Sequence, residues 1–203
     1  MQRNRYSARM TSDTSPRVSH HGLDNHFLIA MPALSDPNFS RTVTYLCEHN
    51  EDGAMGLVIN RPLEITLDEI FKHMGIGDAD PVVAAAPIYL GGPVQPDRGF
   101  VLHTPIGAWE STLRVTDDIG VTTSQDVLKA MAEGKGPEHA LVALGYAGWG
   151  TGQLEAEIID NAWLSVPAES DIIFHLPSEQ RWRAAAASLG IDLDRLSSDA
   201  GHA

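Results

Sequence analysis

The chain has 203 residues, of which 43% are hydrophobic and 18 are glycine, a composition typical of one globular domain and unlike that of a disordered or collagenous chain. It carries 27 acidic residues against 14 basic ones, a formal net charge of −13. Affinity for nucleic acid comes mainly from cationic side chains that replace counterions on phosphate, so this charge argues against direct DNA binding and against an anionic membrane surface. No apolar run approaches the roughly 20 residues that span a bilayer.

The first 22 residues differ in charge from the rest of the chain. They contain four arginines and one aspartate, a net charge of +3, which leaves −16 for the remainder. They lack the apolar stretch of a secretory signal. We expect a disordered N-terminal extension over residues 1–22, one folded domain over 23–196 and a frayed C-terminal tail over 197–203.

The first predicted elements are strands. Residues 27–31 form an apolar run, and residues 42–49 are rich in β-branched and aromatic side chains. A short polar loop at 50–53 and a second apolar run at 55–59 complete the pattern of a β-hairpin.

Two helices are predicted in the middle of the chain. Thr66 and Glu69 have the spacing of a capping box, apolar residues recur with helical period from Leu67, and Gly75 stands where a helix ends. A second helix is predicted over residues 123–134.

Short strands and turns surround and follow these helices. Strands are predicted at 88–90, 99–103 and 112–115, and the unbroken apolar run 140–144 predicts a central strand buried on both faces. A glycine-rich loop at 145–152, a helix over 153–160, a strand over 163–166 and a helix capped by Ser178 follow. Without a long linker, this mixture predicts a single α/β (α+β) domain.

The glycine-rich segment 145–152 needs a separate test, because a strand, a glycine loop and a helix can together hold phosphate. Its glycines have the spacing of a P-loop, but Thr151 stands where the lysine is required, and no dinucleotide fingerprint fits. Two glutamates early in the following helix would also repel phosphate. These features favour a tight turn against which Tyr146 and Trp149 pack over a nucleotide site.

Cys47 and His49 suggest a catalytic pair, because they lie two residues apart on a predicted strand and would share its face. Their Cα atoms would be about 6 to 7 Å apart, which is loose for a direct hydrogen bond. A lone cysteine is more often a small buried hydrophobe, and it agrees with a reducing compartment. The nine histidines show no zinc-ligand spacing, so we expect no metal and no cofactor.

Polar residues and glycines gather where predicted strands end, in Asn60-Arg61-Pro62, Gly91-Gly92-Pro93 and Arg98-Gly99. Arginines beside glycine turns in an acidic chain are candidates for clamping an anion, provided that the turns converge. The alternative is that Arg61 and Arg98 pair with surface acids.

Three long strings of the sequence resemble the bacterial YqgE/AlgH family, also called UPF0301 or DUF179. They are LIAMPALSDPNFSRTVTYLCEHNEDGAMGLVINRP at 28–62, YLGGPVQPDRGFVLH at 89–103 and LVALGYAGWGTGQLEAEIIDNAWL at 141–164. The resemblance implies a bacterial cytoplasmic protein whose mixed sheet is bent into a partial barrel with flanking helices. The family is often labelled a transcriptional regulator and has no agreed mechanism.

The densest family motifs supply the pocket candidates, which are Cys47, His49, Asn60, Arg61, Gly91, Gly92, Arg98, Gly148, Trp149 and Asn161. We expect a binding or regulatory protein with a cleft for a small molecule or a partner protein. The alternatives are an enzyme of unknown reaction that uses Cys47, His49 or Arg61, and a structural or assembly protein. The cleft hypothesis predicts that Cys47, Arg61, Arg98 and Trp149 share one pocket.

Overall fold

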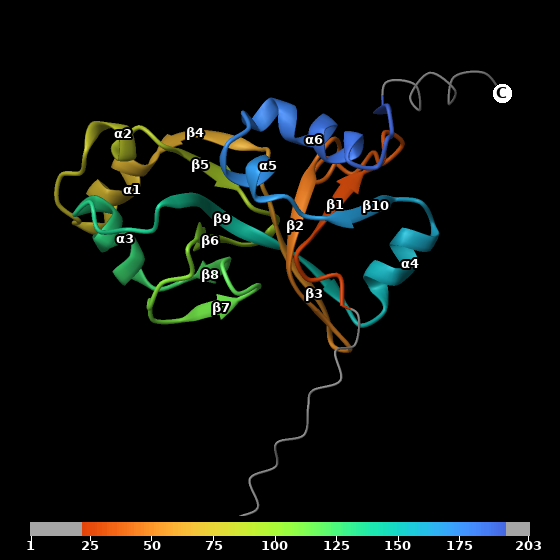
Figure 1. The fold of residues 1–203 in the computed structure, drawn as a ribbon, viewed down its shortest axis with the longest axis horizontal. Coiled ribbons are helices and arrows are strands. Elements are labelled where there is room, and N and C mark those ends of the chain that lie inside the picture. The colour runs from red at the N-terminus through yellow and green to blue at the C-terminus, as the bar shows by residue number, and fades with distance from the viewer. Residues whose placement is uncertain (1–21, 194–203) are drawn as a thin grey trace, which may run out of the picture.

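The computed structural model of the chain describes residues 22–193 (Figure 1). The strands are β1 (His26–Ala30), β2 (Val43–Asn50), β3 (Gly53–Val58), β4 (Pro62–Thr66), β5 (Pro87–Leu90), β6 (Val94–Thr104), β7 (Thr112–Arg114), β8 (Gly120–Thr122), β9 (His139–Gly150) and β10 (Trp163–Pro167). The helices are α1 (Leu67–Met74), α2 (Pro81–Ala84), α3 (Gln125–Ala132), α4 (Gln153–Ile159), α5 (Ser170–Phe174) and α6 (Ser178–Ala187).

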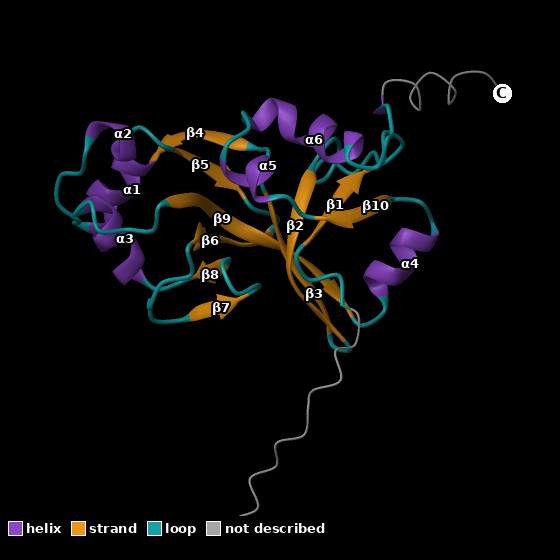
Figure 2. Cartoon of the chain, in the orientation of Figure 1, coloured by secondary structure: helices purple, strands orange, loops and turns teal. Residues whose placement is uncertain are grey.

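The strands form one mixed sheet in the order β10-β1-β2-β3-β9-β6-β8-β7, with β5 also paired to β9 and β4 paired to β5. The β5–β9 pair is parallel and the other pairs are antiparallel. The sheet curls into a half-barrel (Figure 2). α5 and α6 pack against the cluster that lines its inner face, while α1, α3 and α4 pack against the other face. The predicted fold class is therefore confirmed.

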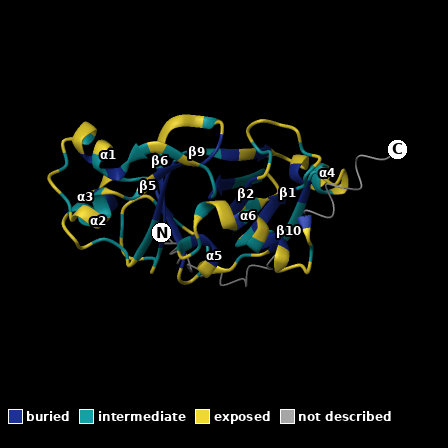
Figure 3. Cartoon of the chain, turned by 90° about the horizontal axis from the view of Figure 1, so that it is seen from above, coloured by how far each residue is buried: buried dark blue, intermediate teal, exposed yellow. Residues whose placement is uncertain are grey.

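The 12-residue strand β9 organises the sheet. Its first half pairs with β5 and β6, and its second half pairs with β3. Buried residues follow the strands, and exposed ones gather on helices and loops (Figure 3). Tyr45, Leu57 and Leu102 belong to the cluster inside the half-barrel, while α4 packs over Trp149 and Trp163 in a second cluster.

Most predicted elements are present, but the capping box at Thr66 is not. Thr66 is the last residue of β4 and pairs with Pro87, so its side chain makes no capping hydrogen bond. The amide of Leu67 instead donates to Ala86 O at 2.9 Å. Gly75 ends α1 in the left-handed conformation, with φ 66°, as predicted.

The prediction of a loop at 145–152 is wrong, because β9 continues through Gly150. Gly53 of β3 pairs with Gly150, and a Cβ on Gly53 would lie 2.1 Å from Trp149 O. Gly53, and Gly145, whose Cβ would lie 2.4 Å from Gly92 O, are required because neighbouring backbones approach closely.

Four short elements, β4, α2, β8 and α5, were not predicted, since each is three to five residues long and lacks a periodic pattern. The extension expected over 1–22 and the tail expected over 197–203 lie outside the described residues, apart from Gly22. In the described part, no helix is long and apolar enough to cross a membrane.

Candidate functional site

An open groove of about 720 Å³ lies between the β2–β3 hairpin, the second half of β9 and the β6–β8–β7 strands. Apolar side chains line its inner part, namely Met55, Val94, Phe100, Leu113, Val121 and Tyr146. Polar side chains surround them, namely Glu48, Asn50, Asp52, Arg98, Ser111 and Thr123. An apolar floor with a few polar groups at its margin is the usual composition of a ligand site.

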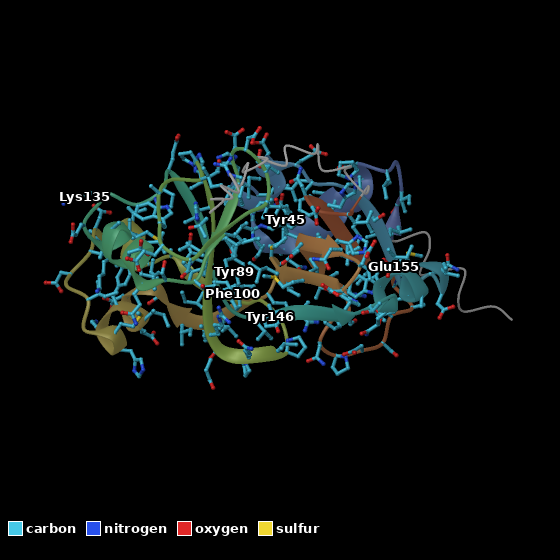
Figure 4. The ribbon with its side chains drawn as sticks, turned by 90° about the horizontal axis from the view of Figure 1, so that it is seen from below. Tyr45, Tyr89, Phe100, Lys135, Tyr146 and Glu155 are labelled. Atoms are coloured by element: carbon cyan, nitrogen blue, oxygen red, sulfur yellow. The ribbon has the colours of Figure 1, made fainter. Side chains whose placement is uncertain are left out.

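Arg98 is the cation of this groove. Its guanidinium lies 5.5 Å from the centroid of the Phe100 ring, and Phe100 meets Tyr146 edge to face with 5.6 Å between centroids. Phe100 and Tyr146 are neighbours in the middle of the molecule (Figure 4). Arg98 is exposed and binds Gln95 Oε1 at 3.3 Å and Thr123 Oγ1 at 3.5 Å. Among residues 22–193 it has no carboxylate within 4.0 Å, so its charge is available to a ligand.

Gly148 gives the groove an open strand edge. Along a strand, the N–H and C=O groups of successive residues point to opposite edges. The Val58 N–H donates to Gly91 O, away from β2, so every second residue of β3 counted from Val58 also points away from β2. The N–H and C=O groups of Ala147 and Trp149 therefore point to β3, while the N–H and C=O of Gly148 point to the opposite edge. On that edge the ladder with β6 ends at the Val94–Tyr146 pair.

A β-bulge at Cys47 changes which residues of β2 face the groove. Leu46 pairs with Gly56 and Glu48 with Met55, so Cys47 is an extra residue. Because a bulge shifts the alternation of side chains, Glu48 lines the groove and His49 turns to the other face. The prediction that Cys47 and His49 share a face is therefore wrong.

Cys47 has no feature of a catalytic thiol. It is 3% exposed, packs in the cluster inside the half-barrel and donates its S–H to Tyr45 O at 3.6 Å. Burial, with a smaller contribution from Glu48, raises the pKa of the thiol far above its ordinary value. The Cys47 version of the enzyme hypothesis thus receives no support.

His49 anchors the start of the described chain. Its Nδ1 accepts the Leu23 N–H at 3.0 Å, so the ring proton lies on Nε2 and is donated to Glu155 Oε1 at 2.7 Å. The His49 N–H also donates to the carboxylate of Asp24. The Glu155 backbone N–H and His49 together lower the pKa of the Glu155 carboxyl. Both ring nitrogens of His49 are therefore occupied by structural contacts.

Asn60 and Arg61 hold a loop through hydrogen bonds to residues 37–43. Arg61 donates to Pro37 O at 2.7 Å and to Ser40 O at 2.9 Å, and burial lowers the pKa of its guanidinium. Asn60 accepts the Val43 N–H at 2.9 Å and donates to a backbone carbonyl at 2.9 Å. Their bonds fasten residues 37–43 to the end of β3.

Backbone crowding or a left-handed backbone conformation explains the residue types at Gly91, Gly92 and Asn161. A Cβ would lie 2.3 Å from Gly145 O at Gly91, and 2.2 Å from the Tyr146 carbonyl carbon at Gly92. Asn161 is exposed and adopts φ 58° directly after α4. These three positions serve the fold.

Of the ten predicted pocket residues, the groove contains Arg98 and Gly148 and is bordered by Trp149. The Trp149 indole packs on the opposite face, where it stacks on Phe39 and donates to Glu157. The single cleft expected for Cys47, Arg61, Arg98 and Trp149 is therefore not formed.

Sequence reasoning missed Glu48, Asp52, Phe100 and Tyr146 as groove residues. All four lie inside the family strings, but nothing in the residue pattern separated them from their neighbours. Within residues 22–193, no three His, Cys, Asp or Glu side chains are grouped to hold a metal ion.

Comparison with known proteins shows a matching family and similar relatives. The AlgH-like family matches residues 27–194. A UPF0301 protein of Nitrosococcus oceani is 62% identical over 179 residues, which cover 88% of this chain and 96% of the relative. A UPF0301 protein of Chromobacterium violaceum is 58% identical over 181 residues, which cover 89% of this chain and 97% of the relative.

Two solved structures are similar. The solution structure of AlgH from Pseudomonas aeruginosa is 54% identical, with a TM-score of 0.75 over 93% of this chain and 100% of that one. A crystal structure from Corynebacterium diphtheriae shares the fold at 20% identity, with a TM-score of 0.66 over 85% and 90% of the two chains. The chain is a member of the AlgH-like family of UPF0301 proteins.

Proposed function

We propose that the chain is a binding protein whose groove takes a ligand or partner segment with an anionic group next to an aromatic or apolar group. The observation that carries the proposal is the Arg98 guanidinium, which has no carboxylate partner in the described chain and lies over the Phe100 ring, itself in edge-to-face contact with Tyr146. A guanidinium binds a carboxylate or phosphate through paired hydrogen bonds.

The remaining polar groups narrow the ligand class. The N–H of Gly148, which has no strand partner on the groove side among residues 22–193, offers a backbone donor to the same ligand. Glu48 and Asp52 are exposed carboxylates of the groove and would repel a polyanion. The groove therefore favours a ligand with a single acidic group over a nucleic-acid backbone.

This proposal keeps a regulatory role possible without DNA contact, because a regulator can act through a small molecule or a partner protein. A basic surface would be needed for DNA, and the chain has a net charge of −13. The enzyme alternative is weaker, since Cys47 is buried and His49 and Arg61 are engaged in structural bonds.

The test uses 8-anilinonaphthalene-1-sulfonate, an anionic aromatic probe, titrated into the full chain and followed by fluorescence. We expect Arg98→Gln to weaken binding about tenfold, the equivalent of one charge-assisted hydrogen bond. Tyr146→Leu should weaken binding severalfold through loss of the ring.

Arg114→Gln is the matched control, because Arg114 is an exposed arginine whose loss changes the net charge equally, and it does not line the groove. Equal affinity in wild type, Arg98→Gln and Arg114→Gln would show that the probe does not use Arg98, and the proposal would then fail.

A further inference from the structure

We infer that residues 1–21 of the chain bind in the acidic part of the groove and compete there with an external ligand. The inference rests on the proposed function, since it concerns the same groove. It assigns the groove a partner of stated chemistry, a basic segment that the chain itself carries.

The described chain starts at the edge of β2, next to two groove residues but against the face that His49 turns away from the groove. The Leu23 N–H and the Asp24 carboxylate both bind His49, and a Cβ on Gly22 would lie 2.8 Å from His49 O. His49 stands between Glu48 and Asn50, which line the groove. Figure 1 shows these first residues next to the end of β3 that carries the hairpin turn. Residues 1–21 are therefore tethered at the groove's margin.

The charges of segment and groove are complementary. Residues 1–21 hold four arginines, namely Arg3, Arg5, Arg9 and Arg17, against one aspartate. The hairpin presents the exposed carboxylates of Glu48, Glu51 and Asp52. Within residues 22–193 none of the three has a basic side chain within 4.0 Å, so their charge is not neutralised by the described fold.

The apolar floor gives the segment more than charge to bind. Tyr6 and Met10 each directly follow an arginine, so the segment carries apolar side chains next to basic ones. The groove offers Met55 and Leu113 below its acidic margin. An aromatic or thioether side chain can cover such a floor while the arginines stay at the rim.

The tether makes weak binding sufficient. Arg17 is five residues from Gly22 in the sequence, so it can lie at most about 18 Å from it, and 21 residues reach at most about 70 Å. A short flexible linker gives an effective concentration in the millimolar range. A segment with an affinity of only about 1 mM would thus be bound about half of the time, and an external ligand would have to displace it.

The experiment is paramagnetic relaxation enhancement on the full chain, with a nitroxide on Ser7→Cys; the buried Cys47 thiol leaves the label specific to the new cysteine. We expect broadening of the amides of Glu48, Gly53 and Gly148. In Glu48→Gln/Asp52→Gln the broadening should fall at least threefold, and about 0.5 M NaCl should have a similar effect because it screens exposed charges.

Glu64→Gln/Glu69→Gln is the matched control, since these exposed acids on β4 and α1 lie outside the groove and their loss changes the net charge equally. The same broadening in both double variants would overturn the inference. Broadening in a mixture of labelled chain and unlabelled ¹⁵N chain would assign the groove to a second copy and also overturn it.

The two proposals fail separately. Arg98-dependent binding of the fluorescent probe without acid-dependent broadening leaves the proposed function standing and removes the inference. If the broadening depends on Glu48 and Asp52 but probe binding does not depend on Arg98, the proposed ligand class is wrong. Residues 1–21 then remain the proposed partner of the groove.

Discussion

Glu157 connects α4 to two strands through buried indole groups, and its replacement is a sharp test of the fold around β9. Its Oε2 accepts the Nε1–H of Trp149 at 2.9 Å and of Trp163 at 2.8 Å, and its Oε1 accepts from Gln153 Nε2 at 2.8 Å. Trp149 is 5% exposed and Trp163 is 2% exposed. Glu157→Leu therefore leaves two buried N–H groups without an acceptor.

The magnitude follows from those two groups. An unsatisfied buried donor costs about 1–3 kcal/mol, so two cost roughly 2–6 kcal/mol. The leucine recovers part of this by packing against the rings, and we expect a loss of about 3 kcal/mol in the free energy of unfolding. Glu157→Gln keeps a carbonyl oxygen for the indoles and loses the charge and the exposed bond from Gln153, so its cost should be about 1 kcal/mol.

Urea unfolding followed by tryptophan fluorescence measures both variants, since Trp149 and Trp163 report on the site directly. Glu69→Leu on α1 is the control, because Glu69 is exposed and its loss should stay within about 0.5 kcal/mol of wild type. If Glu157→Leu costs less than about 1 kcal/mol, or if Gln is as harmful as Leu, the hydrogen bonds are not what joins α4 to the sheet.

Three further predictions concern buried groups. Because burial raises the pKa of the Cys47 thiol, iodoacetamide at neutral pH should alkylate Cys47 at least about 100-fold more slowly than glutathione, as measured by mass spectrometry; equal rates would contradict the burial. Burial lowers the pKa of the His103 imidazole below its ordinary value of 6.5, so the unfolded chain binds the proton first and the free energy of unfolding should fall as the pH drops below about 6.5; an NMR titration midpoint at or above 6.5 would refute this. Gly92→Ala, with φ 155° and a Cβ 2.2 Å from backbone, should cost about 3 kcal/mol or more in urea unfolding, whereas Gly75→Ala, with open space around its Cβ, should cost about 1 kcal/mol; equal costs would show that crowding is not the cause.

The sequence pattern predicted those elements that are determined by residues close together in the sequence. The β2–β3 hairpin and α1 follow from residues within one short window, a turn between two apolar runs and an apolar stripe ended by Gly75. The capping box failed because β4 runs directly into α1, and strand pairing with Pro87 fixes Thr66 before its side chain can cap the helix. A distant strand thus overrode the local signal.

The glycine run at 145–152 shows the same limit. Glycine marks a loop when only one segment is considered, yet here Gly148 and Gly150 are strand residues. Gly91 and Gly92 run against the backbone of β9, and Gly53 runs against Trp149. Close approach of segments far apart in the sequence is the reason for Gly53, Gly91 and Gly92, and a single sequence does not show such contacts.

The groove arises from two interruptions of otherwise regular strands, and neither has a sequence signal. The bulge at Cys47 brings Glu48 onto the inner face of the half-barrel. The shift in register of β6 between Val94 and Gly99 leaves Gly148, which pairs with Met55 of β3, without a partner in β6. Regular pairing at both places would bury the edge of β9 and turn Glu48 outward. Arg98 lies within the shifted part of β6, so the irregularity that opens the edge also places the cation beside it. A strand edge without a partner in β6, an exposed guanidinium and an aromatic pair occur together at this irregularity, and this coincidence supports the proposal that the groove binds a ligand, because closing the ladder would add backbone hydrogen bonds.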